Sequence, residues 1–224
     1  MDRNTLTVER WHTAYHESGH AVVRWYLGMD FESIEIGRNK TKQKKRVGSV
    51  KIVEYPAILM IERLLRSGMR EAAEMEAMRN VVHLFAGLVS AANFCGDVDW
   101  METGLMDFAI DDKNSDIGRV RQTTRALGIE SIEDTVTFCR TAAKWTQELI
   151  EVDEVATAIK AVADELYAKN KLSWKQFCDI VGWVPPEDRD DDSDEVFAPF
   201  HRGGMLWFDR FCDETECETR YLSR

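Results

Sequence analysis

Apolar residues recur with the period of an α-helix along most of this chain of 224 residues. In segment 5–26, at about 100° per residue, one side of the helix collects Trp11, Ala14, Tyr15, Ala21, Val22, Trp25 and Tyr26. Further helices are expected at 57–66, from beyond Gly68 to about Phe94, from about Asp116 to Gly128, after Ser131, at 153–169 and from Ser173 to Gly182. This succession predicts a mainly helical domain.

A different period interrupts the helical pattern after the first helix. Residues 31–36 and 47–53 alternate apolar and polar side chains, as half-buried strands do, and the segment 37–46 between them is polar. The lysines of this segment are read as a solvated hairpin tip rather than as a docking patch for acidic substrates. The predicted fold class is therefore α+β, mainly α-helical, with a small β-ribbon next to the first helix.

A change of composition after the last predicted helix divides the chain. Pro185 and Pro186 are followed by the acidic run 187–195, whose charges repel one another and oppose packing. We expect one domain over 1–182 and, over 183–224, an acidic linker with an aromatic C-terminal tail. The tail contains His201, Cys212 and Cys217, but their spacing fits no common zinc pattern.

Charge and composition limit the partners and the location. The net charge of −11 opposes a general affinity for nucleic acids or anionic membranes, so peptides, proteins or small molecules are the expected partners. The most apolar run, 80–95, is shorter than the roughly 20 residues of a membrane helix, and no export signal is recognised. Disulfides are not expected, and Cys95, Cys139 and Cys178 are interpreted as small core residues. We predict a cytoplasmic protein.

The segment AYHESGHAVV at 14–23 carries the clearest chemical signal. His16 and His20 lie one helical turn apart, so both can bind a single metal ion, and Glu17 can reach a water on that ion. Zinc lowers the pKa of such a water to about 7, while the glutamate takes its proton and passes it to the leaving amine. The expected reaction is amide hydrolysis. The alternative is an ordinary surface helix with a chance pattern.

Two neighbours of the motif refine this hypothesis. Glycine inside a helix costs about 1 kcal/mol relative to alanine, so Gly19 predicts that another element approaches the helix closely. His12 continues the histidine stripe, but it lies about 12 Å from His20 along the helix axis and cannot share the same ion. We interpret His12 as a surface or supporting residue.

A catalytic zinc needs a third protein ligand and keeps one position for water. The candidates are Asp116, at the start of a predicted helix, and Asp107, Asp111 and Asp112, just before it. An aspartate at a helix start is also favoured by the helix dipole, by roughly 0.3–1 kcal/mol. The residues alone therefore leave the third ligand open.

AYHESGHAVV resembles the zinc helix of the FtsH family of membrane-bound, ATP-dependent metalloproteases, in which the pattern is typically AYHEAGHA. Similar stretches follow in the family's order, at 33–36 with 47–50, 84–87 through 94–96, 114–117 with Arg121 and Gly128, and 161–180. The resemblance covers about 11–182. It implies that Asp116 completes the zinc site and that the strand 47–53 binds an extended peptide as an additional strand.

The chain also departs from the family. It contains no G-x-x-x-x-G-K-[ST] phosphate loop, so we expect it not to unfold substrates with ATP by itself. Leu88, Ala91 and Ala92 stand where the family has an arginine and two glutamates. These charges would otherwise support the fold or the site. The acidic and aromatic tail has no recognised counterpart.

The predicted function is that of an ATP-independent zinc metalloendopeptidase acting on peptides or unfolded protein segments. His16, His20 and Asp116 are the predicted Zn²⁺ ligands, and Glu17 is the predicted general base and acid. The alternative is a non-catalytic zinc-containing module that binds a protein or peptide partner or regulates it. A structural zinc would need a fourth ligand and no base, which favours the enzyme. A homo-oligomer and a separate ATPase partner remain open.

Overall fold

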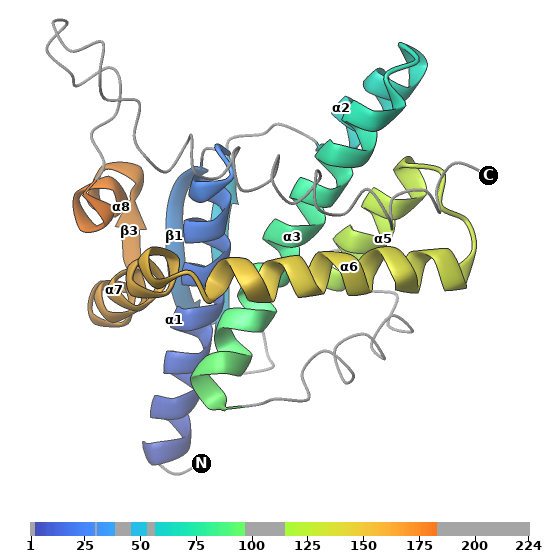
Figure 1. Cartoon of the computed structure of the whole chain (residues 1–224). Helices are drawn as coiled ribbons and strands as arrows, with labels where there is room; N and C mark the ends of the chain where they lie inside the picture. Colours follow the sequence, from blue (N-terminus) through green and yellow to red (C-terminus); the bar gives the residue numbers. More distant parts are fainter. Residues whose placement is uncertain (1–2, 30, 39–45, 53–56, 97–114, 183–224) are drawn as a thin grey trace, which may run out of the picture.

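The structure, a computed structural model, describes residues 3–29, 31–38, 46–52, 57–96 and 115–182 (Figure 1). Over these residues the elements are α1 (Arg3–Tyr26), β1 (Phe31–Arg38), β2 (Arg46–Ile52), α2 (Ala57–Arg66), α3 (Arg70–Cys95), α5 (Asp116–Ala126), α6 (Ile132–Ile150), α7 (Asp153–Lys169), β3 (Lys171–Ser173) and α8 (Trp174–Val181). The predicted class, α+β and mainly α-helical, is confirmed.

Short-range capping accounts for the starts of several helices. The hydroxyl of Ser115 accepts a hydrogen bond from the Gly118 N–H at the start of α5, and Ser131 caps α6 in the same way. Ser173 and Gln176 form a capping box at the start of α8. These caps satisfy backbone donors that have no partner within the helix, so the helices begin where the sequence predicts.

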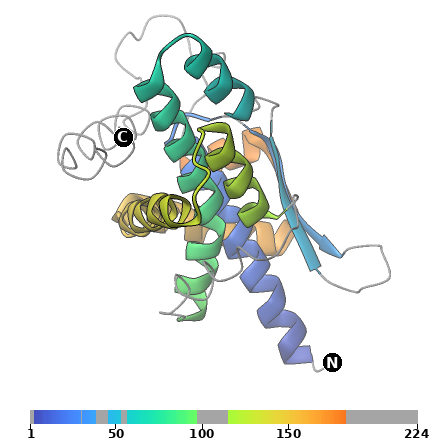
Figure 2. The same cartoon turned by 90° about the vertical axis from the view of Figure 1, so that its right-hand side faces the viewer.

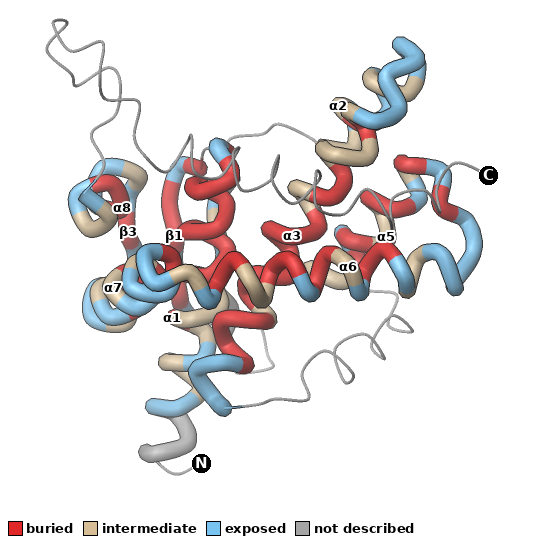
Figure 3. The backbone as a smooth tube through the Cα atoms, viewed as in Figure 1, coloured by how far each residue is buried: buried red, intermediate tan, exposed pale blue. Residues whose placement is uncertain are grey.

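The centre of the fold is the packing of α1 against α3. The helix α1 also contacts α7 and both long strands, and α3 contacts α2, α5 and α6. Figure 1 shows α6 running across α3. From Glu17 to its end at Tyr26, α1 is buried on every side, including Val23 on the face that carries the histidines, and Leu27 just after the helix is buried as well (Figure 3). That face therefore belongs to the interior of the domain.

Within the described ranges, the sheet has three strands in the order β2, β1, β3, all antiparallel to their neighbours. Ile34 of β1 is paired with Val50 on one side and with Leu172 on the other. The strand β3 was not predicted, because its three residues are too few to reveal an alternating pattern. The strand β2 lies at an edge of the sheet, and Figure 2 shows the sheet flanking α1.

Several predictions fall outside the described residues or differ from the structure. The hairpin tip, the acidic linker and the aromatic tail, with His201, Cys212 and Cys217, lie outside the described ranges. Cys139 and Cys178 are buried as expected, whereas Cys95 is exposed, because it ends α3 beyond the core. Among the described residues, no helix combines the length and the apolar character that crossing a membrane requires.

Candidate metal centre

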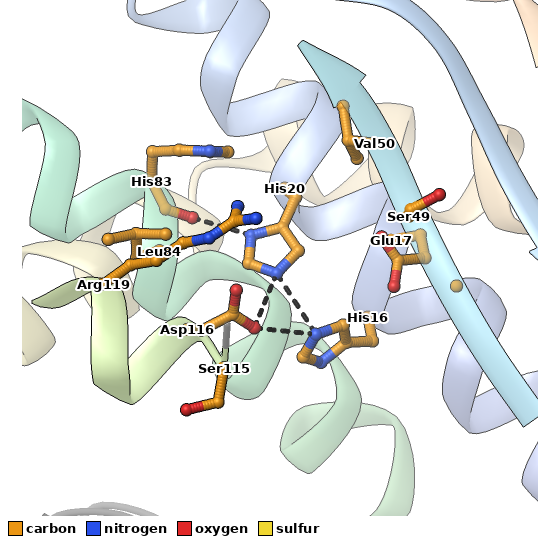
Figure 4. A pocket seen from close by; sticks show the side chains of 11 residues that line it. His16, Glu17, His20, Ser49, Val50, His83, Leu84, Ser115, Asp116 and Arg119 are labelled. Atoms are coloured by element: carbon orange, nitrogen blue, oxygen red, sulfur yellow. Dashed lines mark hydrogen bonds and ion pairs between the residues drawn. The ribbon is translucent and has the colours of Figure 1, made fainter. Parts of the chain in front are cut away.

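The structure brings together two histidines of α1 and one aspartate of α5 (Figure 4). Oδ2 of Asp116 lies 3.1 Å from Nε2 of His16 and 3.2 Å from Nε2 of His20. The two Nε2 atoms are 3.1 Å apart. This group could hold a metal ion.

The spacing of the three donor atoms fits a single small cation. Around a tetrahedral ion with bonds of about 2.0–2.1 Å, two ligand atoms are separated by about 3.3 Å. The observed separations of 3.1–3.2 Å are close to that value. Little rearrangement is therefore needed for all three atoms to bind one ion.

The backbone of α3 orients one of the imidazoles. Nδ1 of His20 lies 2.9 Å from the carbonyl oxygen of His83. A carbonyl oxygen only accepts hydrogen bonds, so Nδ1 carries a hydrogen, and in the neutral imidazole Nε2 presents its lone pair to the ligand group. His83 is itself buried, and desolvation together with the nearby His20 and Arg24 holds the pKa of its imidazole well below the ordinary value.

The electrostatics of the group favour a positive charge between its members. Burial lowers the pKa of His20, but the charge and hydrogen bond of Asp116 outweigh it and raise the pKa to about 9. Burial likewise raises the pKa of Asp116, yet the two histidines hold it well below the usual range of a carboxyl group. The imidazoles of His16 and His20 and the carboxylate of Asp116 all point electron pairs at one another. A proton or a metal cation among them removes the resulting repulsion.

Glu17 lies beside this group without belonging to it. Its side chain is only 6% exposed, and burial raises the pKa of its carboxyl group. Figure 4 shows it on the side of the histidines that faces β2. A Cβ atom added to Gly48 of β2 would overlap Cγ and Oε1 of Glu17, so the carboxylate fits against the bare backbone of that strand.

Two further glycines, Gly87 and Gly19, leave room for the close packing of α1 against α3 at the site. A Cβ on Gly87 of α3 would overlap the imidazole of His20, and one on Gly19 would overlap Ser90 and the carbonyl oxygen of Ala86. The close approach predicted at Gly19 is thus confirmed. Gly48 and Gly87 were not predicted to matter, although Gly87 carried a signal, since glycine within an apolar helical pattern is unfavourable without a packing reason.

An open cavity of about 250 Å³ adjoins the three candidate ligands. It is lined from β2 by Ser49 and Val50, from α3 by His83 and Leu84, and from α5 by Arg119. Sequence reasoning did not single out His83 or Arg119 for the site. Neither belongs to a local motif, and only the packing of three elements around the cavity brings them there.

The remaining sequence candidates do not join the group. His12 is exposed and lies outside it. The alternative acids Asp107, Asp111 and Asp112 lie outside the described residues. Ala91 and Ala92 are buried and Leu88 packs against the core, so apolar packing occupies these positions, where the FtsH pattern has charges.

Comparisons with protein families and with curated proteins found no match to this chain. The likeness to the FtsH peptidase therefore rests on the short stretches described above. Independent support for a function comes from the geometry of the metal centre.

Proposed function

We propose that this protein is an ATP-independent zinc metallopeptidase that hydrolyses peptide bonds in peptides or unfolded protein segments. The observation that carries the proposal is the place of Glu17, a buried carboxylate next to the three candidate ligands but not among them. A purely structural zinc is normally held by four protein ligands. Within the described part of the chain, no fourth histidine, cysteine or acid joins the group.

The donor set suits zinc. Two imidazoles and one carboxylate form a three-ligand set of the kind used by catalytic zinc sites, which leave a position for water. A bound zinc ion would acidify that water and polarise the carbonyl group of a substrate. The hydrogen bond from His20 to the His83 carbonyl oxygen is the kind of support that such a ligand usually has.

Glu17 has the surroundings of a residue that transfers protons. In the proposed reaction it takes a proton from the attacking water and then delivers it to the amine nitrogen as the peptide bond breaks. The raised pKa of its carboxyl group brings its proton affinity nearer to neutral pH, which assists both steps. Its contact with Gly48 restricts the directions in which the carboxylate can point.

The edge of β2 supports binding of an extended peptide. The N–H of Ile36 donates to the carbonyl oxygen of Asn170, on the side of β1 that faces β3. The pair between Ile36 and Gly48 is therefore a non-hydrogen-bonded pair of the β1–β2 ladder. It follows that Gly48 and Val50 direct their N–H and C=O groups toward the outer edge of β2. Main-chain pairing there would tolerate many substrate sequences.

The test is a paired measurement of zinc content and cleavage of an unfolded protein. Glu17→Gln should keep zinc and lose cleavage by about 10²- to 10⁴-fold, the usual contribution of a general base. His16→Ala should lose both properties. The matched control is His12→Gln, which changes an exposed histidine one turn along the same helix and should keep both.

The outcomes separate the enzyme from a binding module. If the wild-type protein and Glu17→Gln bind zinc equally and neither cleaves peptides or unfolded proteins, the peptidase proposal is wrong. In that case, capture of a peptide by both proteins would identify the non-catalytic alternative.

A further inference from the structure

Arg119 is a cation in the candidate site that the proposed reaction has not yet used. It lies on α5, one helical turn after Asp116, so the two side chains share a face of that helix. Arg119 lines the same cavity as the candidate ligands. Figure 4 shows its side chain entering this cavity from the α5 side, beside Leu84, whereas Glu17 borders the cavity from the β2 side.

The charge of Arg119 is distinctive in this cavity. Among the described residues that line it, Arg119 is the only lysine or arginine, and two of the others are the acids Glu17 and Asp116. The side chain of Arg119 is exposed, and it forms no ion pair or hydrogen bond with another described residue.

Peptide hydrolysis moves negative charge in the direction that such a cation favours. When water adds to the carbonyl carbon, the proton released neutralises Glu17, and the electron pair of the C=O bond becomes the lone pair of an oxyanion. Negative charge thus leaves the β2 side of the cavity and appears on the reacting carbonyl. A cation on the side of the cavity opposite Glu17 stabilises the charge on the oxyanion more than the earlier charge on Glu17, which lowers the barrier.

We propose that Arg119 donates hydrogen bonds to the oxyanion of the tetrahedral intermediate and is a catalytic residue of this site. This inference rests on the proposed peptidase function. In the second half of the reaction the oxyanion re-forms the C=O bond, the C–N bond breaks, and Glu17 protonates the departing amine. Arg119 remains protonated throughout, since its guanidinium does not release a proton in proteins.

Kinetics of Arg119 variants test this role in the zinc-loaded full-length protein. The substrate is an internally quenched peptide with uncharged side chains and an amidated C-terminus, so it offers no carboxylate. Arg119→Gln should lower kcat by about 10²- to 10³-fold, as the loss of an oxyanion donor does, with KM changed less than about threefold. Arg119→Lys should keep part of the activity. The matched control is Arg125→Gln, an exposed arginine of α5 outside the cavity, which should match the wild type.

A binding measurement provides a readout that does not depend on turnover. A phosphinic peptide carries a tetrahedral anion in place of the scissile bond, so Arg119→Gln should weaken its binding by about the same factor as kcat/KM. In the Glu17→Gln background, where the substrate persists, the same change should leave the Kd of the substrate peptide unaltered. Isothermal titration calorimetry measures both affinities, and zinc content is determined for every variant.

Three results would overturn the inference. Unchanged kcat and unchanged phosphinic peptide affinity in Arg119→Gln would exclude a role at the oxyanion. Equal weakening of substrate and phosphinic peptide binding would make Arg119 a ground-state anchor instead. Failure of the wild-type protein to cleave any peptide would refute the proposed function itself. If the wild-type protein cleaves and Arg119→Gln cleaves equally fast, only the role of Arg119 is refuted.

Discussion

The side chain of Glu17 occupies the space that a side chain on Gly48 would need. Glu17 belongs to α1 and Gly48 to the edge strand β2, so the carboxylate lies between a helix and a strand. Because Glu17 is buried and confined there, β2 as well as α1 determines where the carboxylate points relative to His16 and His20. The strand proposed to hold the substrate therefore also positions the proposed base.

Gly48→Ala should disable the base without removing the metal. The added methyl group overlaps Cγ, Cδ and Oε1 of Glu17, so the carboxylate must move. We expect kcat to fall by about 10²-fold, in line with the cost of a misplaced catalytic group, and zinc affinity to stay within about twofold. Gly37→Ala in β1 is the control, since a Cβ there meets no atom within 4 Å. Full activity of Gly48→Ala would contradict this account of Glu17.

Gly87→Ala should weaken metal binding. Its methyl group would overlap the imidazole of His20, including Nε2. Alanine raises helix propensity by about 1 kcal/mol relative to glycine, so a loss of zinc could not be attributed to a weaker α3. We expect zinc affinity to fall by about 10- to 100-fold, as for the loss of other ligand-supporting contacts, with an unchanged far-ultraviolet circular dichroism spectrum. Competition with a chromophoric chelator measures the affinity, and an unchanged value would refute the prediction.

Val50→Pro should impair binding of an extended substrate while preserving the fold. The Val50 N–H is inferred to point outward from the edge strand, so proline removes a donor to the substrate and no bond of the β1–β2 ladder. We expect KM, and the Kd of a peptide in the Glu17→Gln background, to rise about fivefold, since one lost hydrogen bond is worth about 1 kcal/mol. Val50→Ala keeps the N–H and serves as the control. Equal effects of both substitutions would show that side-chain packing, not the main chain, is responsible.

The contact between His20 and Asp116 predicts that the stability of the metal-free protein and the stability of the zinc-bound protein change with pH in opposite directions. In the metal-free chain the pKa of His20, about 9, exceeds its ordinary value of 6.5. Protonated His20 therefore stabilises the fold fully below about pH 6.5, and this contribution is lost as the pH rises through 9. This difference corresponds to about 3 kcal/mol. Zinc requires deprotonated His20, so the zinc-bound protein should gain stability over the same range. Urea unfolding at several pH values, with chelator and with zinc, measures both trends.

Asp116→Asn is the control for this pH effect. The amide removes the charge that raises the pKa of His20, so stability of the metal-free variant should be nearly independent of pH between about 6.5 and 9. Zinc affinity should fall as well, because a charged ligand is lost. Persistence of the wild-type pH dependence in Asp116→Asn would mean that another group is responsible.

Much of the secondary structure was predictable because it depends on residues near one another in the chain. Gly96 and Gly182 adopt the left-handed conformation that ends α3 and α8, and Ser173 with Gln176 caps the start of α8. The strand β3 was not predictable in this way. Leu172 belongs to a strand only because Ile34, far away in the sequence, provides its partner in the sheet.

For the candidate site, the spacing of His16, Glu17 and His20 by itself determined that two imidazoles share one side of a helix and that a carboxylate stands next to them. The tertiary structure alone decided which acid faces them, since Asp116 lies 96 positions from His20 and is brought close by the packing of α1 and α5 against α3. It also decided the contacts of Gly48, Gly87 and Arg119. Helical spacing is a local property of the backbone, whereas these contacts follow from the burial of apolar surfaces between distant segments.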